Sequence, residues 1–123
     1  MNELTLFLMI FAHIVDDYYL QGILASMKQK AWWQENASDA MYRFDYIIAL
    51  TAHSFSWAFM IMFPIVIAYN FGINPHVYCI VSLINMVVHA IVDDLKANKK
   101  KINLIIDQSI HLVQILVTWL YFM

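Results

Sequence analysis

The sequence predicts an all-α integral membrane protein, a bundle of four transmembrane helices with both termini on the outer side. Of its 123 residues, 63% are apolar and only 13% are charged, an unusual composition for a soluble domain. Four runs of about 20 mostly apolar residues are each long enough to cross a bilayer. They cover approximately residues 4–24, 46–69, 76–95 and 102–123. We therefore expect residues 1–123 to form one transmembrane helical domain.

The connections between the spans differ in length. Residues 25–45 form the longest one, a polar segment whose Met27, Ala31 and Trp32 could lay one face of a short helix on the lipid headgroups. The second connection contains Gly72 and Pro75, which favour a tight turn. The sequence thus predicts an interfacial segment at 25–45 and short turns elsewhere.

The basic residues predict the orientation. All seven lie in the first and third connections, and the termini and second connection have none: Lys28, Lys30, Arg43, Lys96, Lys99, Lys100 and Lys101. The positive-inside rule assigns those two connections to the cytoplasm. We expect a multi-pass protein of the inner membrane, with the lipid bilayer as its main partner.

The composition gives little support to a nucleic-acid partner and none to a disulfide. The net charge is −2 and the basic residues are not interleaved with aromatic ones, so we expect no nucleic-acid partner. Cys79 is the only cysteine, which excludes an intramolecular disulfide.

Polar residues inside the predicted spans carry the functional signal. On the predicted topology they all fall in the cytoplasmic halves of their helices, although the helices alternate in direction. The main ones are His13, Asp16, Asp17, Gln21, His53, His89, Asp93, Asp94, Asp107, Gln108 and His111. Because charged groups in a bilayer cost at least about 2.5–3.5 kcal/mol each, they need partners or a wet cavity. We expect them to meet in one pocket.

The spacing of these residues indicates a metal site. Three His/Asp pairs lie four residues apart, one helical turn on one face: His13 and Asp17, His89 and Asp93, Asp107 and His111. No lysine or arginine is expected at this depth. The carboxylates must then be protonated, paired with imidazolium or bound to a cation, and the many imidazoles favour a divalent metal, zinc above others.

The predicted ligands outnumber one tetrahedral site. With His53 added to the three pairs they are His13, Asp17, His53, His89, Asp93, Asp107 and His111. Two ions about 3.5–4 Å apart, or one ion with an outer shell and a catalytic carboxylate, would account for the surplus. His53 could instead join two helices by a hydrogen bond. Asp16 and Asp94 could support the ligands or reach toward the headgroups.

The order of the motifs resembles a known family. Ala12-His13-xxx-Asp17-xxx-Gln21, then His53, His89-xxx-Asp93-xx-Lys96 and Asp107-Gln108-xx-His111 resemble a family of small bacterial and phage-associated membrane proteins catalogued as a domain of unknown function. The resemblance covers nearly the whole chain and implies that Asp17 and Asp93 matter more than their aspartate neighbours. The family commonly has two histidines in the second span, where this chain has only His53. The pattern is more distantly similar to membrane-bound metal-dependent hydrolases.

Three hypotheses of function follow. The first is a metal-dependent hydrolase in which Asp17, Asp93 or Asp107 acts as the base, on a lipid, lipid-linked or membrane-adjacent ester or phosphoester. The second is an ion- or proton-coupled transport or binding subunit, which would require a homo-oligomer because four helices make a thin wall around a pathway. The third is a small membrane effector whose polar cluster only fixes the helix register.

Overall fold

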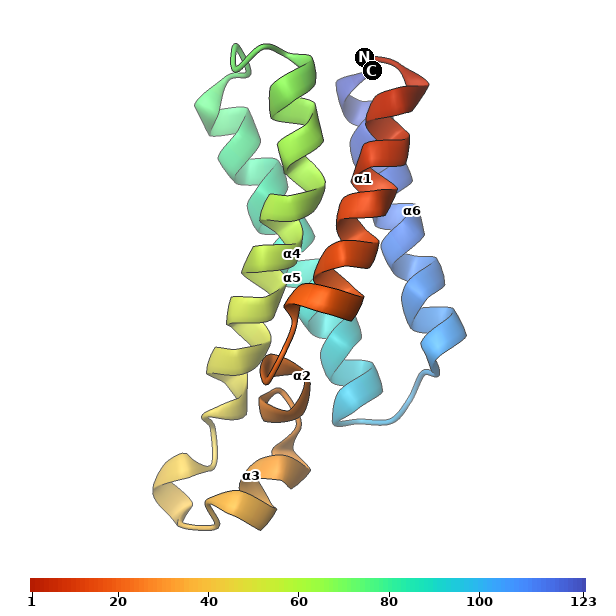
Figure 1. Cartoon of the computed structure of the whole chain (residues 1–123). Coiled ribbons are helices and arrows are strands. Elements are labelled where there is room, and N and C mark those ends of the chain that lie inside the picture. The colour runs from red at the N-terminus through yellow and green to blue at the C-terminus, as the bar shows by residue number, and fades with distance from the viewer.

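The computed structural model describes residues 1–123, and every regular element in it is helical. Four helices, α1, α4, α5 and α6, run alongside one another, and short helices lie beyond them at one end (Figure 1). In chain order the elements are α1 (Glu3–Val15), the π-helix η1 (Asp16–Leu20), α2 (Leu24–Met27), α3 (Lys30–Asn36), the 3₁₀ helix η2 (Ala40–Tyr42), α4 (Tyr46–Ala68), α5 (Pro75–Ala97) and α6 (Leu104–Phe122). The all-α prediction is confirmed.

Three helices are long and apolar enough to cross a membrane: the stretch Ala40–Ala68 that contains α4, then α5 and α6. Their bounds agree closely with the predicted runs. Large apolar side chains such as Phe7, Phe55 and Ile105 point outward and are exposed. Such an apolar surface is typical of a protein that faces lipid.

The first helix departs from its predicted bounds. We expected a helix over residues 4–24, but the continuous helix of α1 and η1 ends at Leu20. Gly22 follows in the left-handed conformation, with φ of 54°, and turns the chain into α2. The last turn is π-helical over Asp16 and Asp17. A π turn shifts the direction of the side chains after it and is frequent at functional sites.

Asparagine begins three of the four long helices. The side chain of Asn2 accepts a hydrogen bond from the Thr5 backbone N–H, and Asn103 accepts one from Ile106. Asn74 accepts from the backbone N–H groups after Pro75, whose fixed φ suits the first helical position. These caps satisfy backbone donors that the helix itself leaves unpaired.

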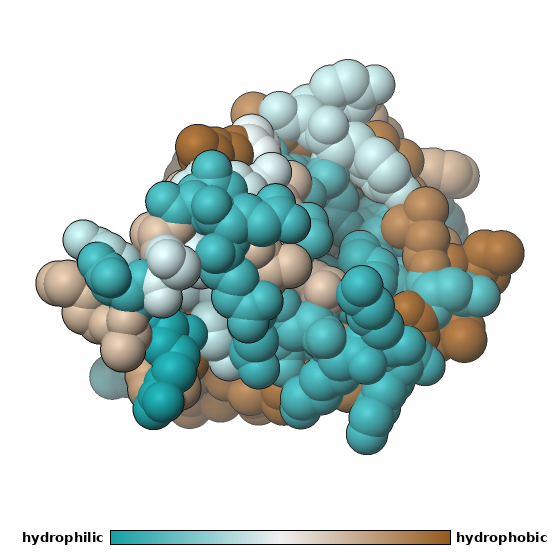
Figure 2. Space-filling model, turned by 90° about the horizontal axis from the view of Figure 1, so that it is seen from below, coloured by the Kyte–Doolittle hydropathy of each residue, from teal (hydrophilic) through white to brown (hydrophobic).

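The bundle has two ends of different character. The termini and the α4–α5 turn lie at one end, and α3 and the α5–α6 connection lie at the other (Figure 1). We call the second the basic end because all the lysines and the arginine named above lie there. Viewed from below, hydrophilic residues cover much of this end and apolar residues surround them (Figure 2).

The interior is divided in the same way. The half toward the termini has an apolar core of Met9, Trp57, Ala58, Ile61, Met62, Ile65, Ile115 and Phe122. Its side chains come from α1, α4 and α6, with α5 residues packed against them. Between Trp57 and the basic end, most of the buried residues are polar or charged. The candidate site lies in this polar part of the interior.

Candidate metal site

The predicted ligands meet in one buried cluster. They come from α1 and η1, α4, α5 and α6. Five of them are each at most 1% exposed: His53, His89, Asp93, Asp107 and His111. His13 is 2% exposed, and the Asp17 side chain is 8% exposed. The seven residues therefore meet in one cluster, as predicted.

Three atoms at the centre have the geometry of a metal site. Asp17 Oδ1 lies 3.2 Å from His53 Nε2, which lies 3.2 Å from His89 Nε2. The third side of this triangle, from His89 Nε2 to Asp17 Oδ1, is 3.9 Å. Bonds of 2.0–2.2 Å in a tetrahedral site put ligand atoms about 3.3–3.6 Å apart. These distances are compatible with three ligands of one ion, and Asp93 Oδ2 lies beside two of them, 3.5 Å from His53 Nε2 and 3.7 Å from His89 Nε2.

A second group shares one member with the first. His89, Asp93 and His111 also lie close enough together to hold an ion. His111 Nε2 is 3.7 Å from Asp93 Oδ1, and the rings of His89 and His111 stack with their centroids 4.1 Å apart. Asp107 Oδ1 approaches the same His111 nitrogen to 3.3 Å. The two groups together contain every predicted ligand except His13 and Asp107.

His13 has a different role from the other histidines. Trp57 Nε1 donates to His13 Nδ1 at 2.8 Å, so the proton of the neutral ring is on Nε2. That nitrogen lies 2.9 Å from Gln108 Oε1 and donates to it. Both ring nitrogens of His13 therefore have partners, and the residue orients Gln108.

Gln108 links two of the predicted carboxylates. Its amide nitrogen lies 3.1 Å from Asp17 Oδ2 and 2.9 Å from Asp107 Oδ2 and donates to both. The sequence predicts Gln108 only as one of the polar residues inside the spans. The signal that could have identified it is its position directly after Asp107.

Lysines reach the cluster, contrary to the expectation that no cation lies at this depth. Lys28 Nζ is 2.7 Å from Asp93 Oδ2, and Lys96 Nζ is 2.8 Å from Asp107 Oδ2. Lys28 follows α2, which folds under the bundle, and it is only 6% exposed. Asn98 holds it there by donating to its carbonyl oxygen. Lys96 enters because a long side chain can extend from its helix toward a carboxylate on a neighbouring one.

The Asp16 carboxylate lies behind His53 without a hydrogen bond to it. His53 Nδ1 lies 3.5 Å from Asp16 Oδ2, while its Nε2 faces the centre of the cluster. Ser56 donates to the other oxygen of the same carboxylate. A carboxylate behind a histidine fixes the ring and raises its basicity in many metal sites. Asp94 lies apart and contacts Asn98 and Lys99 near the surface.

Several buried polar atoms in the cluster have no hydrogen-bond partner. They are Asp17 Oδ1, His89 Nδ1, Asp107 Oδ1, His111 Nε2 and Asp16 Oδ2. Buried polar atoms are rarely left in this condition because each costs about 1–3 kcal/mol. One of these atoms, Asp17 Oδ1, belongs to the triangle, and another, His111 Nε2, belongs to the second group. Their lone pairs fit a bound cation.

The charge balance agrees with that fit. Four carboxylates surround the cluster, on Asp16, Asp17, Asp93 and Asp107, and two ammonium groups, on Lys28 and Lys96, are paired with them. With ionised carboxylates and neutral histidines, two negative charges remain. A buried cluster requires compensation of these charges, which one divalent cation or protonation of cluster residues would supply.

The residues present can therefore hold a divalent metal ion. The set of imidazole nitrogens and carboxylate oxygens suits zinc and other first-row metals. Comparison of the chain with family models, with curated proteins and with solved structures finds no match.

Proposed function

We propose that this protein is a metal-dependent hydrolase of the inner membrane, with a single divalent ion, zinc, bound by Asp17, His53 and His89. The observation that carries the proposal is the triangle of their three ligand atoms. Three protein ligands and an open position are typical of catalytic zinc sites, whereas structural sites use four. A zinc ion in such a position lowers the pKa of bound water and polarises an ester oxygen.

The side chains around the triangle have roles in this reaction. Asp107 is the proposed base, because its Oδ1 is buried, faces the cluster and accepts no hydrogen bond. Asp93 Oδ2 lies 3.5 Å from His53 Nε2 and is paired with Lys28, so in this proposal the fourth coordination position is taken by water. Gln108 keeps Asp17 and Asp107 in a fixed relation through its two donated bonds.

The lysines favour an anionic substrate. Lys28 and Lys96 place two ammonium groups at the carboxylates of the cluster. On arrival of a phosphoester these groups can turn from the carboxylates to the phosphate oxygens, which carry more charge in the transition state. Because the cluster lies inside the bundle near its basic end, we propose a lipid or lipid-linked phosphoester as the substrate.

The proposed membrane arrangement has four spans, the shorter α1–η1 helix being the first. Both termini are outside and the basic end is in the cytoplasm, as the positive-inside rule requires. Single cysteines at Asn74 and Lys100, in a Cys79→Ser background, report this orientation. A membrane-impermeant maleimide added to intact spheroplasts is expected to label Asn74→Cys and not Lys100→Cys. The reverse pattern would mean that the basic end faces outward.

Hydrolysis can be tested on purified full-length protein in mixed micelles with zinc. The substrates are p-nitrophenyl carboxyl esters and phosphoesters with long alkyl chains. We expect the protein to hydrolyse the phosphoesters. His89→Ala and Asp107→Asn should each abolish this activity, and Asp107→Asn should still bind zinc. A protein fully loaded with zinc that turns over none of these esters would rule out the hydrolase.

A second candidate function is proton-coupled transport, which a chain of hydrogen bonds favours. It begins at the cluster, where His111 Nδ1 lies 3.1 Å from Gln114 Oε1. Gln114 donates to the Asn85 carbonyl oxygen, and Asn85 donates to Thr118 Oγ1 at 2.9 Å. The polar path thus extends from the site toward the end with the termini. The test is proton flux into proteoliposomes that contain the protein. Flux that the Asn85→Leu variant abolishes would support transport by an oligomer.

A further inference from the structure

A second polar site lies at the basic end, apart from the metal cluster. A pocket of about 390 Å³ lies between α3 and the chain that leads into α4. Its lining includes two cations, Lys30 and Arg43, and the aromatic residues Trp33, Tyr42 and Tyr46. Pockets of this size hold small ligands or the headgroups of larger ones.

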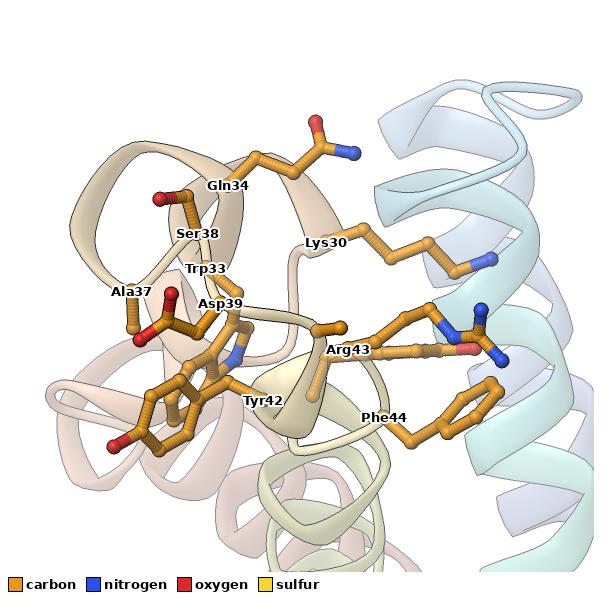
Figure 3. A pocket seen from close by; sticks show the side chains of 11 residues that line it. Lys30, Trp33, Gln34, Ala37, Ser38, Asp39, Tyr42, Arg43 and Phe44 are labelled. Atoms are coloured by element: carbon orange, nitrogen blue, oxygen red, sulfur yellow. The ribbon is translucent and has the colours of Figure 1, made fainter.

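The two cations are free to bind an anion. The ion pairs of the lysines involve Lys28, Lys96 and Lys99, and neither Lys30 nor Arg43 takes part in one. Asp39 also lines the pocket, but its carboxylate points away from them, on the side of Tyr42 (Figure 3). The Lys30 ammonium and the Arg43 guanidinium extend to the same side (Figure 3). They present two unpaired positive charges together.

Aromatic rings hold both cations in place. Lys30 Nζ lies 4.9 Å from the centre of the Tyr46 ring, and the Arg43 guanidinium carbon lies 4.5 Å from that of Phe44. Cation–π contacts of this kind order the long side chains before a ligand arrives. A stack of Trp33 on Tyr42, with ring centres 6.4 Å apart, joins α3 to η2 and supports the pocket wall.

The backbone around the pocket is also anchored. The N–H of Lys30 donates to Asn98 Oδ1 at 2.7 Å, which ties the start of α3 to the end of α5. The indole of Trp33 donates to the Met27 carbonyl oxygen at 2.7 Å. The pocket is therefore built by contacts that do not depend on a ligand.

We propose that this pocket binds the phosphate headgroup of an anionic phospholipid, with Lys30 and Arg43 as its cations. Its place at the end of an apolar bundle, beside tryptophan and tyrosine, is that of the lipid headgroups. Basic pockets at the cytoplasmic ends of transmembrane helices recognise acidic headgroups by charge. The site requires only that the helices cross a bilayer and is independent of the hydrolase.

The test is native mass spectrometry of the full-length protein in detergent, titrated with phosphatidylglycerol or phosphatidylcholine. We expect clear preference for phosphatidylglycerol, and about a tenfold or greater loss of affinity in Lys30→Gln/Arg43→Gln, since each basic group near an anionic surface contributes about a fivefold factor. The charge-preserving variant Lys30→Arg/Arg43→Lys should keep the preference.

A matched control separates the pocket from general charge. Lys100→Gln/Lys101→Gln removes the same charge from exposed residues of the α5–α6 connection. An equal loss of affinity in this control would show attraction to the whole basic end and overturn the proposal. So would equal binding of both lipids. Binding of glycerol phosphate as tightly as phosphatidylglycerol would assign the pocket to a soluble phosphate and would equally contradict a lipid site.

Discussion

Replacement of His89 by alanine is expected to weaken zinc binding by about 100-fold or more. His89 is the member shared by both ligand groups, and its Nε2 lies 3.2 Å from His53 Nε2. Loss of residues that only support metal ligands commonly costs 10–100-fold in affinity, so loss of a ligand should cost at least the upper end of that range. Competition with a chromophoric chelator in detergent measures the affinity.

Two further variants make this prediction specific. His76→Ala removes an exposed histidine at the other end of the bundle and should leave zinc affinity unchanged. His89→Gln preserves more of the buried volume, so it checks that a loss of binding is not a loss of folding. If His89→Gln is folded, by circular dichroism, and binds zinc as tightly as the natural protein, His89 is not a ligand.

Replacement of Lys28 by methionine is expected to destabilise the metal-free protein by about 3–5 kcal/mol. The change keeps most of the apolar stem but removes the ammonium 2.7 Å from Asp93 Oδ2. It leaves a buried carboxylate without its nearest cation, since Lys96 Nζ lies farther away, 4.0 Å from Asp93 Oδ1. Removal of one partner is the costly case for a buried ion pair. The free energy of unfolding in mixed micelles measures the effect.

The prediction for Lys28 has two controls. Lys100→Met removes an exposed lysine of the same end and should change the free energy of unfolding by less than about 0.5 kcal/mol. Lys28→Met/Asp93→Asn removes both charges and should recover much of the stability, because no uncompensated charge remains. Equal stability of Lys28→Met and the natural protein would show that the ion pair has no structural role.

The helices could be predicted from the sequence because apolar runs and turn residues such as Gly72 and Pro75 are local features. The end of the first helix could not, since it depends on the left-handed Gly22 and on the π turn over Asp16 and Asp17. Hydropathy does not distinguish a π turn from an α-helical one. The apolar run continues to Leu24, although the helix ends before it.

The meeting of histidines and aspartates could also be predicted, from their shared depth. The assignment within the cluster could not. His13 and Asp17 are one turn apart and were expected to converge on one ion, but His13 faces Trp57 and Gln108 while Asp17 faces His53 and His89. Spacing along one helix cannot show which neighbouring helix each side chain meets.

The lysines were missed for a related reason. Positions 28 and 96 lie in the predicted connections, and their charge served only to orient the chain. A side chain of that length reaches more than a turn of helix from its own backbone, so the position in the sequence did not give the depth of the ammonium. The spacing of three residues between Asp93 and Lys96 was the available signal.

X-ray absorption at the zinc K-edge, on full-length protein purified in detergent with one equivalent of zinc, tests the metal site most directly. The proposed site predicts four ligands, two of them imidazoles and the others oxygens, at about 2.0–2.2 Å. The imidazole signal should fall in His53→Ala and stay unchanged in His76→Ala. A shell of six oxygens without imidazole, or zinc that does not remain bound, would contradict a metal centre in this cluster.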